Sequence, residues 1–163
     1  MNDLTAWIAS FREQHEQAKK GQLRDADVRL YESSRDQFTR ALLAAQGLAL
    51  PPGTSPRRSL RVARACQVDL ELPKGRRRCL TLDLGAGGFS SLLAEPPPTG
   101  ERIGFSLRLP GGAEPLLGRC ELLEAKPQAG SYRCAFAFLD LPERTVARLE
   151  DQLLDLALEQ LRL

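Results

Sequence analysis

Arginine and glycine residues gather between residues 56 and 89 in a pattern that suits the binding of an anion. Four arginines precede and enter a strand-like run: Arg57, Arg58, Arg61 and Arg64. An acidic, glycine-rich stretch, residues 83–89 (DLGAGGF), follows one hairpin later. The guanidinium fork pairs with phosphate oxygens and with the O6 and N7 edge of guanine, and successive backbone N–H groups of a glycine-rich corner can hold an oxyanion. Because one group begins a strand and the other ends the next, both can face the same small volume, and this favours nucleotide binding over catalysis.

The elements that must position these residues are short strands. From Val62 the hydrophobic period is two, with Cys66, Val68, Leu70 and Leu72 alternating with polar residues, which predicts a half-buried strand. Residues 73–75 (PKG) predict a turn, and 76–84 predict a returning strand with Leu80, Leu82 and Leu84 on one side. Further strands are predicted at 89–93, 102–109, 116–125 and 131–139. About six short antiparallel strands that close on themselves indicate a small barrel.

Helical periods flank this region. Leu4, Trp7, Ile8, Phe11 and His15 predict a first helix that ends near Gly21, and a second is predicted from about 25 to 46, with Val28, Tyr31, Phe38, Leu42 and Ala45 close to one face. We therefore expect an N-terminal helical region at 1–50, a proline-rich linker at 51–56, a barrel at 57–141 and a C-terminal helix at 142–163.

The C-terminal helix is predicted to begin at Pro142 and carries leucines on two faces. One face would pack on the barrel. The other would pack on the N-terminal hairpin or on a partner chain, so a homodimer through this helix is one expectation.

The two motifs resemble those of the PilZ domain family. Arg57-x-x-x-Arg61 is similar to the first family motif, and Asp83-x-Gly85-x-x-Gly88 to the second, with glycine where the family has serine. The resemblance covers roughly residues 56–141. It implies an α+β fold with a six-stranded antiparallel PilZ-type β-barrel, here with an N-terminal helical hairpin and a C-terminal helix, and it implies cyclic di-GMP as the ligand.

By this resemblance, Arg57 and Arg61 would hold phosphate and the guanine edge, with Arg58 beside them. Asp83 would accept hydrogen bonds from guanine N1–H and the exocyclic amine. The corner glycines, Gly85, Gly87 and Gly88, would allow close backbone approach and conformations closed to other residues. Binding would order the linker and change a protein-interaction surface. The resemblance implies a role in motility, polarity or exopolysaccharide control.

Glycine at position 85 keeps a second hypothesis open. Loss of one hydrogen bond to a charged group costs about 1.5–3 kcal/mol, or roughly ten- to hundredfold in affinity. A degenerate PilZ adaptor that binds no nucleotide and acts through an unidentified protein partner is therefore the alternative.

Composition argues against other classes. Residues 51–92 hold 8 basic and 3 acidic side chains on a chain of net charge +2, and this local patch favours a small anion over long nucleic acid. His15 is the one histidine and the four cysteines form no Cys-x-x-Cys pair, so neither an enzyme, a metal site nor a cofactor is expected. With 6% aromatic residues, flavin binding and base stacking are weakly supported.

Other sequence features complete the prediction. The cysteines, Cys66, Cys79, Cys120 and Cys134, lie in strand-like runs and are expected to be small buried hydrophobic residues. The run Arg76-Arg77-Arg78 is interpreted as a solvated strand edge, with an anionic partner site as the alternative. Neither a secretory signal nor a run of 18 apolar residues is present, so we expect a cytoplasmic protein.

Overall fold

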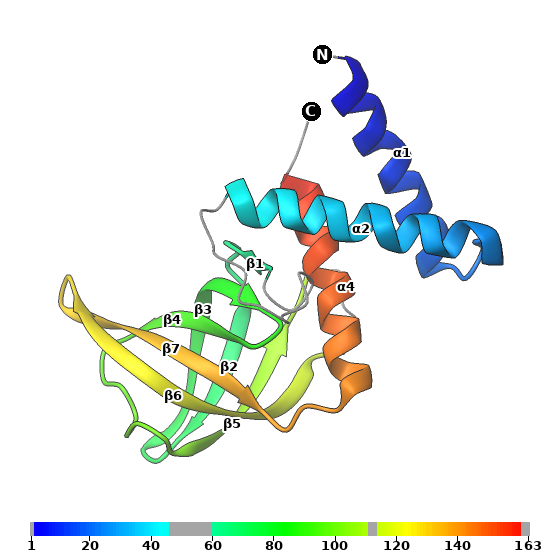
Figure 1. The fold of residues 1–163 in the computed structure, drawn as a ribbon. Coiled ribbons are helices and arrows are strands. Elements are labelled where there is room, and N and C mark those ends of the chain that lie inside the picture. Colours follow the sequence, from blue (N-terminus) through cyan, green and yellow to red (C-terminus); the bar gives the residue numbers. More distant parts are fainter. Residues whose placement is uncertain (1, 46–59, 111–113, 161–163) are drawn as a thin grey trace. The chain divides into compact units, whose positions relative to one another are not determined.

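A computed structural model describes residues 2–45, 60–110 and 114–160 of the chain. It divides into two compact units, Met1–Leu60 with Ala157–Leu163, and Arg61–Leu156. The first unit contains two helices and the second contains all the strands of the described residues. Both units are drawn in Figure 1.

The helical unit contains a pair of helices held together by aromatic rings. Helix α1 spans Asn2–Lys19 and helix α2 spans Asp25–Ala45, and Gly21, with φ of 67°, ends the first helix as predicted. Phe11 is buried and lies 5.9 Å from Tyr31 and 5.2 Å from Phe38, measured between ring centroids. The Nδ1 atom of His15 lies 2.5 Å from the Tyr31 hydroxyl oxygen. His15 is therefore a packed residue of the helical pair.

The buried face of α2 differs from the predicted stripe. Val28 is exposed, whereas Arg35 and Thr39 are buried beside Tyr31 and Phe38. The aromatic residues of α1 contact the face of α2 that carries Tyr31 and Phe38. Arg35 and Thr39 are buried on this face because residues four apart in a helix lie on the same side. Thr39 is satisfied there because its hydroxyl donates to the Arg35 carbonyl at 2.8 Å.

The barrel unit confirms the predicted six-stranded antiparallel barrel. Its strands are β2 (Gln67–Leu72), β3 (Gly75–Gly85), β4 (Gly88–Leu93), β5 (Arg102–Arg108), β6 (Leu116–Gln128) and β7 (Ser131–Leu139). In the described residues they follow the order β3-β2-β5-β6-β7-β4, and pairing of β4 with β3 closes the barrel (Figure 1). Four phenylalanines, at 89, 105, 136 and 138, pack inside it, with ring centroids 5.0–6.4 Å apart.

The strand predicted from Val62 to Leu72 is interrupted. Its first part is the short strand β1 (Arg61–Val62), which pairs with the end of β3, and β2 begins at Gln67. Buried Thr81 bridges the break: its hydroxyl donates to the Arg64 carbonyl at 2.6 Å and accepts from the Cys66 N–H at 2.8 Å. The threonine side chain therefore replaces ladder hydrogen bonds between the two strands.

A bulge in β3 overturns one prediction about side-chain orientation. The register of β3 against β4 shifts between Thr81 and Asp83, so Leu82 is an extra residue. An extra residue reverses the alternation of inward- and outward-facing side chains along the strand. As a result, Leu80 is 58% exposed, whereas Thr81 and Leu84 are both buried. The prediction that Leu80 shares the face of Leu84 is wrong for this reason. After the bulge, Asp83 lies on the outer face of the barrel, opposite Ser90.

Helix α4 (Glu143–Gln160) follows β7. It begins after Pro142, whose carbonyl accepts the N–H of Val146 at 3.0 Å, as expected of a proline at a helix start. The leucines at 149, 153, 154, 156 and 158 are all buried, although they lie on two faces of the helix. The homodimer stays a prediction. No helix in the described part of the chain is long and apolar enough to cross a membrane.

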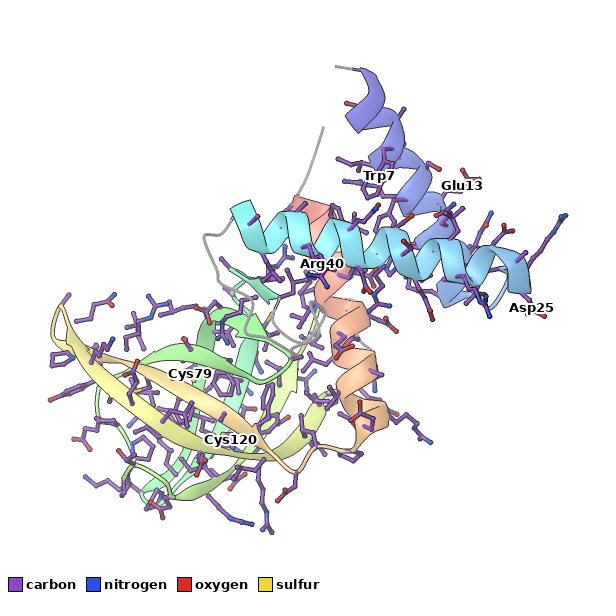
Figure 2. All side chains as sticks on the ribbon, viewed as in Figure 1. Trp7, Glu13, Asp25, Arg40, Cys79 and Cys120 are labelled. Atoms are coloured by element: carbon purple, nitrogen blue, oxygen red, sulfur yellow. The ribbon has the colours of Figure 1, made fainter. Side chains whose placement is uncertain are left out.

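All four cysteines are free thiols. Cys66, Cys120 and Cys134 are buried, as predicted, and Cys79 is half-buried; Figure 2 labels Cys79 on β3 and Cys120 on β6. Burial raises the pKa of Cys120 to about 12, with a smaller contribution from Cys79. Among the described residues, no group of three or more histidine, cysteine or acidic side chains is placed to hold a metal ion.

Candidate ligand-binding site

The centre of the candidate site is Asp83, which lies between two arginines on the outer wall of the barrel. Arg61 Nη2 donates to Asp83 Oδ1, and Arg133 Nη2 donates to Asp83 Oδ2 at 3.1 Å. These residues belong to β1, β3 and β7, which are brought together because β3 pairs with both β1 and β4, and β4 pairs with β7. One carboxylate therefore holds two guanidinium groups in place.

Local pairing explains why the three side chains meet. Arg61 lies opposite Gly85, two residues beyond Asp83 on β3. On the other side, Ser90 of β4 pairs with Asp83 and also with Ala135 of β7. Arg133 is two residues from Ala135 and so projects from the same outer face. The bulge at Leu82 is necessary for this geometry because it turns Asp83 outward.

The carboxylate of Asp83 stays ionised under physiological conditions. Partial burial raises its pKa, but the hydrogen bond and charge of Arg61, the hydrogen bond of Ser90 and the charge of Arg133 outweigh burial and hold the pKa below its ordinary value. Two positive charges around one negative charge leave the cluster with a positive excess. Such a cluster attracts an anion.

The three side chains are within reach of a ligand. The exposed fraction is 38% for the Arg61 side chain, 47% for Arg133 and 23% for Asp83. Each oxygen of Asp83 contacts one guanidinium group, and a carboxylate has about four acceptor positions. Because Ser90 also bonds to the carboxylate, about one of these positions is left for a ligand while both arginines stay in place, and a second ligand donor would take the place of Ser90 or of one arginine.

The glycine corner has one position with a steric requirement. A Cβ atom on Gly88 would lie 1.9 Å from the carbonyl oxygen of Phe136 on β7, so only glycine fits this close approach. A Cβ on Gly87 would meet nothing within 4 Å. None of Gly85, Gly87 and Gly88 has a positive φ, so the prediction of backbone conformations closed to other residues is wrong for this corner. Its shape arises from strand pairing, including the Gly87 carbonyl that accepts the Phe138 N–H at 2.9 Å.

Two predicted site residues, Arg57 and Arg58, lie outside the described residues. Arg61 and Asp83, predicted from separate motifs, are brought together by the barrel. Arg133 was not predicted, because the alternation of β7 shows only that it projects outward. Its contact with Asp83, 50 residues away, depends on the position of β7 beside β4.

The comparisons with known proteins agree with this architecture. The sequence profile of the PilZ domain matches residues 55–155, which is more than half of the chain. The chain belongs to the PilZ domain family. Among curated proteins, none matches this PilZ chain significantly.

Solved PilZ-type structures share the fold at low sequence identity. Escherichia coli YcgR in complex with c-di-GMP superposes with a TM-score of 0.54 at 21% identity, over 62% of this chain and 46% of YcgR. Bacillus subtilis MotI/DgrA, an inhibitor of motility, gives 0.53 at 16% identity, over 62% of this chain and 50% of MotI. The isolated PilZ domain of YcgR with c-di-GMP gives 0.53 at 19% identity, over 62% and 91%. The match thus spans about half of the MotI chain and of the YcgR chain solved with c-di-GMP.

Proposed function

We propose that this protein is a cyclic di-GMP receptor that converts nucleotide binding into a changed protein-interaction surface. The observation that supports the proposal is the Arg61–Asp83–Arg133 cluster on the outer wall of a PilZ barrel. YcgR, which shares this fold, was solved with c-di-GMP. The ligand carries two phosphates and two guanines, and both are groups that arginine recognises.

Each described residue of the cluster has a proposed role. Arg61 and Arg133 donate to phosphate oxygens or to the O6 and N7 edge of one guanine. Asp83 accepts from guanine N1–H and the exocyclic amine, a two-point contact that adenine does not offer. Arg57 and Arg58 stand before β1 in the sequence and add further donors.

The proposed signal passes through the segment before β1. Arg57, Arg58 and Arg61 follow the proline-rich stretch 51–56, which joins the helical unit to the barrel in the sequence. A nucleotide held by these arginines would fix that stretch and alter the surface that the helices offer to a partner. We propose that the protein acts in the cytoplasm and is not an enzyme. We also propose a role in the control of motility, polarity or exopolysaccharide; MotI, which shares the fold, is described as an inhibitor of motility.

A titration of variants tests the site assignment. Arg61→Ala and Arg133→Ala should each weaken cyclic di-GMP binding by about ten- to hundredfold, because each removes a charged hydrogen-bond donor. Arg119→Ala removes an exposed arginine from β6 and is the matched control, with affinity unchanged. Equal affinity in all three variants would show that the nucleotide binds elsewhere.

A protein adaptor that binds no nucleotide is the second candidate function. The observation that favours it is Gly85, which is buried at the pairing with Arg61 and has no hydroxyl to offer a ligand. In this case the helices would contact the partner without a nucleotide signal. Gly85→Ser distinguishes the two candidates. In a receptor it should strengthen cyclic di-GMP binding by about tenfold, and in an adaptor it should leave the binding of the protein partner unchanged.

A further inference from the structure

One edge of β3 is open at the end of the barrel where the β2–β3 hairpin turns. Residues 75–80 of β3 pair with β2, but on the other side β3 meets β4 only from Thr81 onward within the described residues. The hydroxyl of Ser91 on β4 donates to the Leu80 carbonyl at 2.7 Å, so the backbone of Leu80 points away from β2. Since backbone direction alternates along a strand, the N–H and C=O groups of Arg76 and Arg78 also point to the open side.

A cleft lies along this edge. Its volume is about 480 Å³, and it is lined by residues 72–78 of the β2–β3 hairpin and by residues 95–98 (EPPP) after β4. That volume is within the usual range of ligand sites. None of Arg61, Asp83 and Arg133 lines the cleft, so it is separate from the candidate nucleotide site.

Among the arginines of the cleft, Arg77 differs from Arg76 and Arg78 because it has no hydrogen-bond partner among the described residues. Its positive charge nevertheless adds to the hydrogen bond and charge of Lys74 in lowering the pKa of Glu95. Arg76 pairs with Glu71 at 3.0 Å and Arg78 with Asp69 at 3.0 Å, so both side chains turn toward β2 and leave the backbone edge uncovered. Lys74 pairs with Glu95 at 3.0 Å across the cleft. Arg77 forms no hydrogen bond or ion pair with the described residues. It pairs in register with Leu70, which faces the barrel interior, so Arg77 projects from the inner face of β3 at the open end.

We propose that this cleft binds an acidic, extended segment of a partner protein, which adds as a strand to the open edge of β3. The edge offers alternating N–H and C=O groups, and another extended backbone complements them in the mode of β-strand addition. Arg77 selects for a carboxylate on the segment. A free phosphate would use the arginine and leave the backbone groups of Arg76 and Arg78 without partners, so the geometry favours a peptide.

Fluorescence anisotropy with a defined probe tests this proposal. The probe is a fluorescein-labelled peptide of about six residues with alternating glutamate and valine, long enough to cover the open edge. Two further probes carry N-methyl groups on alternate residues, one on the odd and the other on the even positions, so that each removes the donors of one side. A lysine–valine peptide is the charge control.

The expected result is saturable binding of the glutamate peptide that Arg77→Glu weakens at least tenfold. Arg119→Glu makes the same charge change on an exposed β6 position and should leave affinity within about twofold. One N-methylated probe should fail to bind and the other should bind. The proposal is overturned by absence of saturable binding, by equal binding of the lysine peptide, or by equal affinities of both N-methylated probes.

Discussion

Replacement of Asp83 by asparagine separates two roles of this carboxylate. Asparagine has nearly the same size and keeps one acceptor oxygen, but it removes the negative charge between Arg61 and Arg133. The arginine side chains are 38% and 47% exposed, so solvent screens both ion pairs. At roughly 0.5–1 kcal/mol for each such pair, Asp83→Asn should lower the free energy of unfolding by about 1–2 kcal/mol.

Two alternative roles of Asp83 predict opposite effects of the Asp83→Asn substitution on nucleotide affinity. If Asp83 accepts hydrogen bonds from guanine, as we propose, Asp83→Asn replaces an acceptor by a donor and should weaken binding by about ten- to hundredfold. If Asp83 only occupies the arginines in the free protein, its neutralisation frees them for phosphate, and affinity should rise. The two roles can be compared because the two oxygens that would accept from guanine are the ones that contact Arg61 and Arg133 in the free protein.

Two measurements on one preparation resolve the question. Urea unfolding followed by circular dichroism gives the change in stability, and calorimetric titration with cyclic di-GMP gives the change in affinity. Guanine specificity is tested with cyclic di-AMP, which the wild type should reject and the variant should reject less. Tighter cyclic di-GMP binding by Asp83→Asn would refute the role of Asp83 as the guanine acceptor.

Three further predictions concern the barrel. Gly88→Ala should destabilise the fold by about 3 kcal/mol or more, because its Cβ would collide with the Phe136 carbonyl, whereas Gly87→Ala should leave stability unchanged. Urea unfolding measures the free energy of unfolding of both variants, and an equal loss of stability in the two would contradict the contact. The pKa of Asp83 is lower in the folded than in the unfolded protein, so the ion pairs stabilise the fold only while Asp83 is ionised. The stability difference between wild type and Asp83→Asn should therefore be constant above about pH 5 and shrink below about pH 4. A difference that persists in acid would argue against the ion pairs. Burial raises the pKa of the Cys120 thiol to about 12, so iodoacetamide at about pH 8.5 should leave Cys120 unmodified in the folded protein. In guanidinium chloride the same reagent should modify Cys120, and peptide mass spectrometry distinguishes the two results.

The alternation of apolar residues was sufficient to predict the six barrel strands and the helical segments. It failed at Leu80 because the bulge at Leu82 is set by the pairing of β3 with β4, which a count of alternating residues does not contain. It failed at Val28 because the aromatic residues of α1 choose the buried face of α2.

Two local motifs were sufficient to predict Arg61 and Asp83 as candidate site residues, whereas Arg133 was missed because its position beside them depends on the tertiary structure. Arg61 and Asp83 stand out by residue type and spacing, and the structure joins them in an ion pair. Arg133 is one outward residue of β7, and only the neighbouring position of β4 and β7 places it against Asp83. The need for glycine at position 88 likewise comes from the approach of the Phe136 backbone, which is not a local property of the corner.

Calorimetric titration of the whole chain with cyclic di-GMP is the most direct test of the proposed function. Arg61 at the start of β1, together with Asp83 and Arg133, predicts saturable binding with a dissociation constant of about 10 μM or tighter. An Arg61→Ala, Arg133→Ala double variant should lose that binding. A folded wild-type protein that gives no heat at saturating ligand would contradict the receptor function and would favour the adaptor, in which Gly85 marks a site that no longer binds nucleotide.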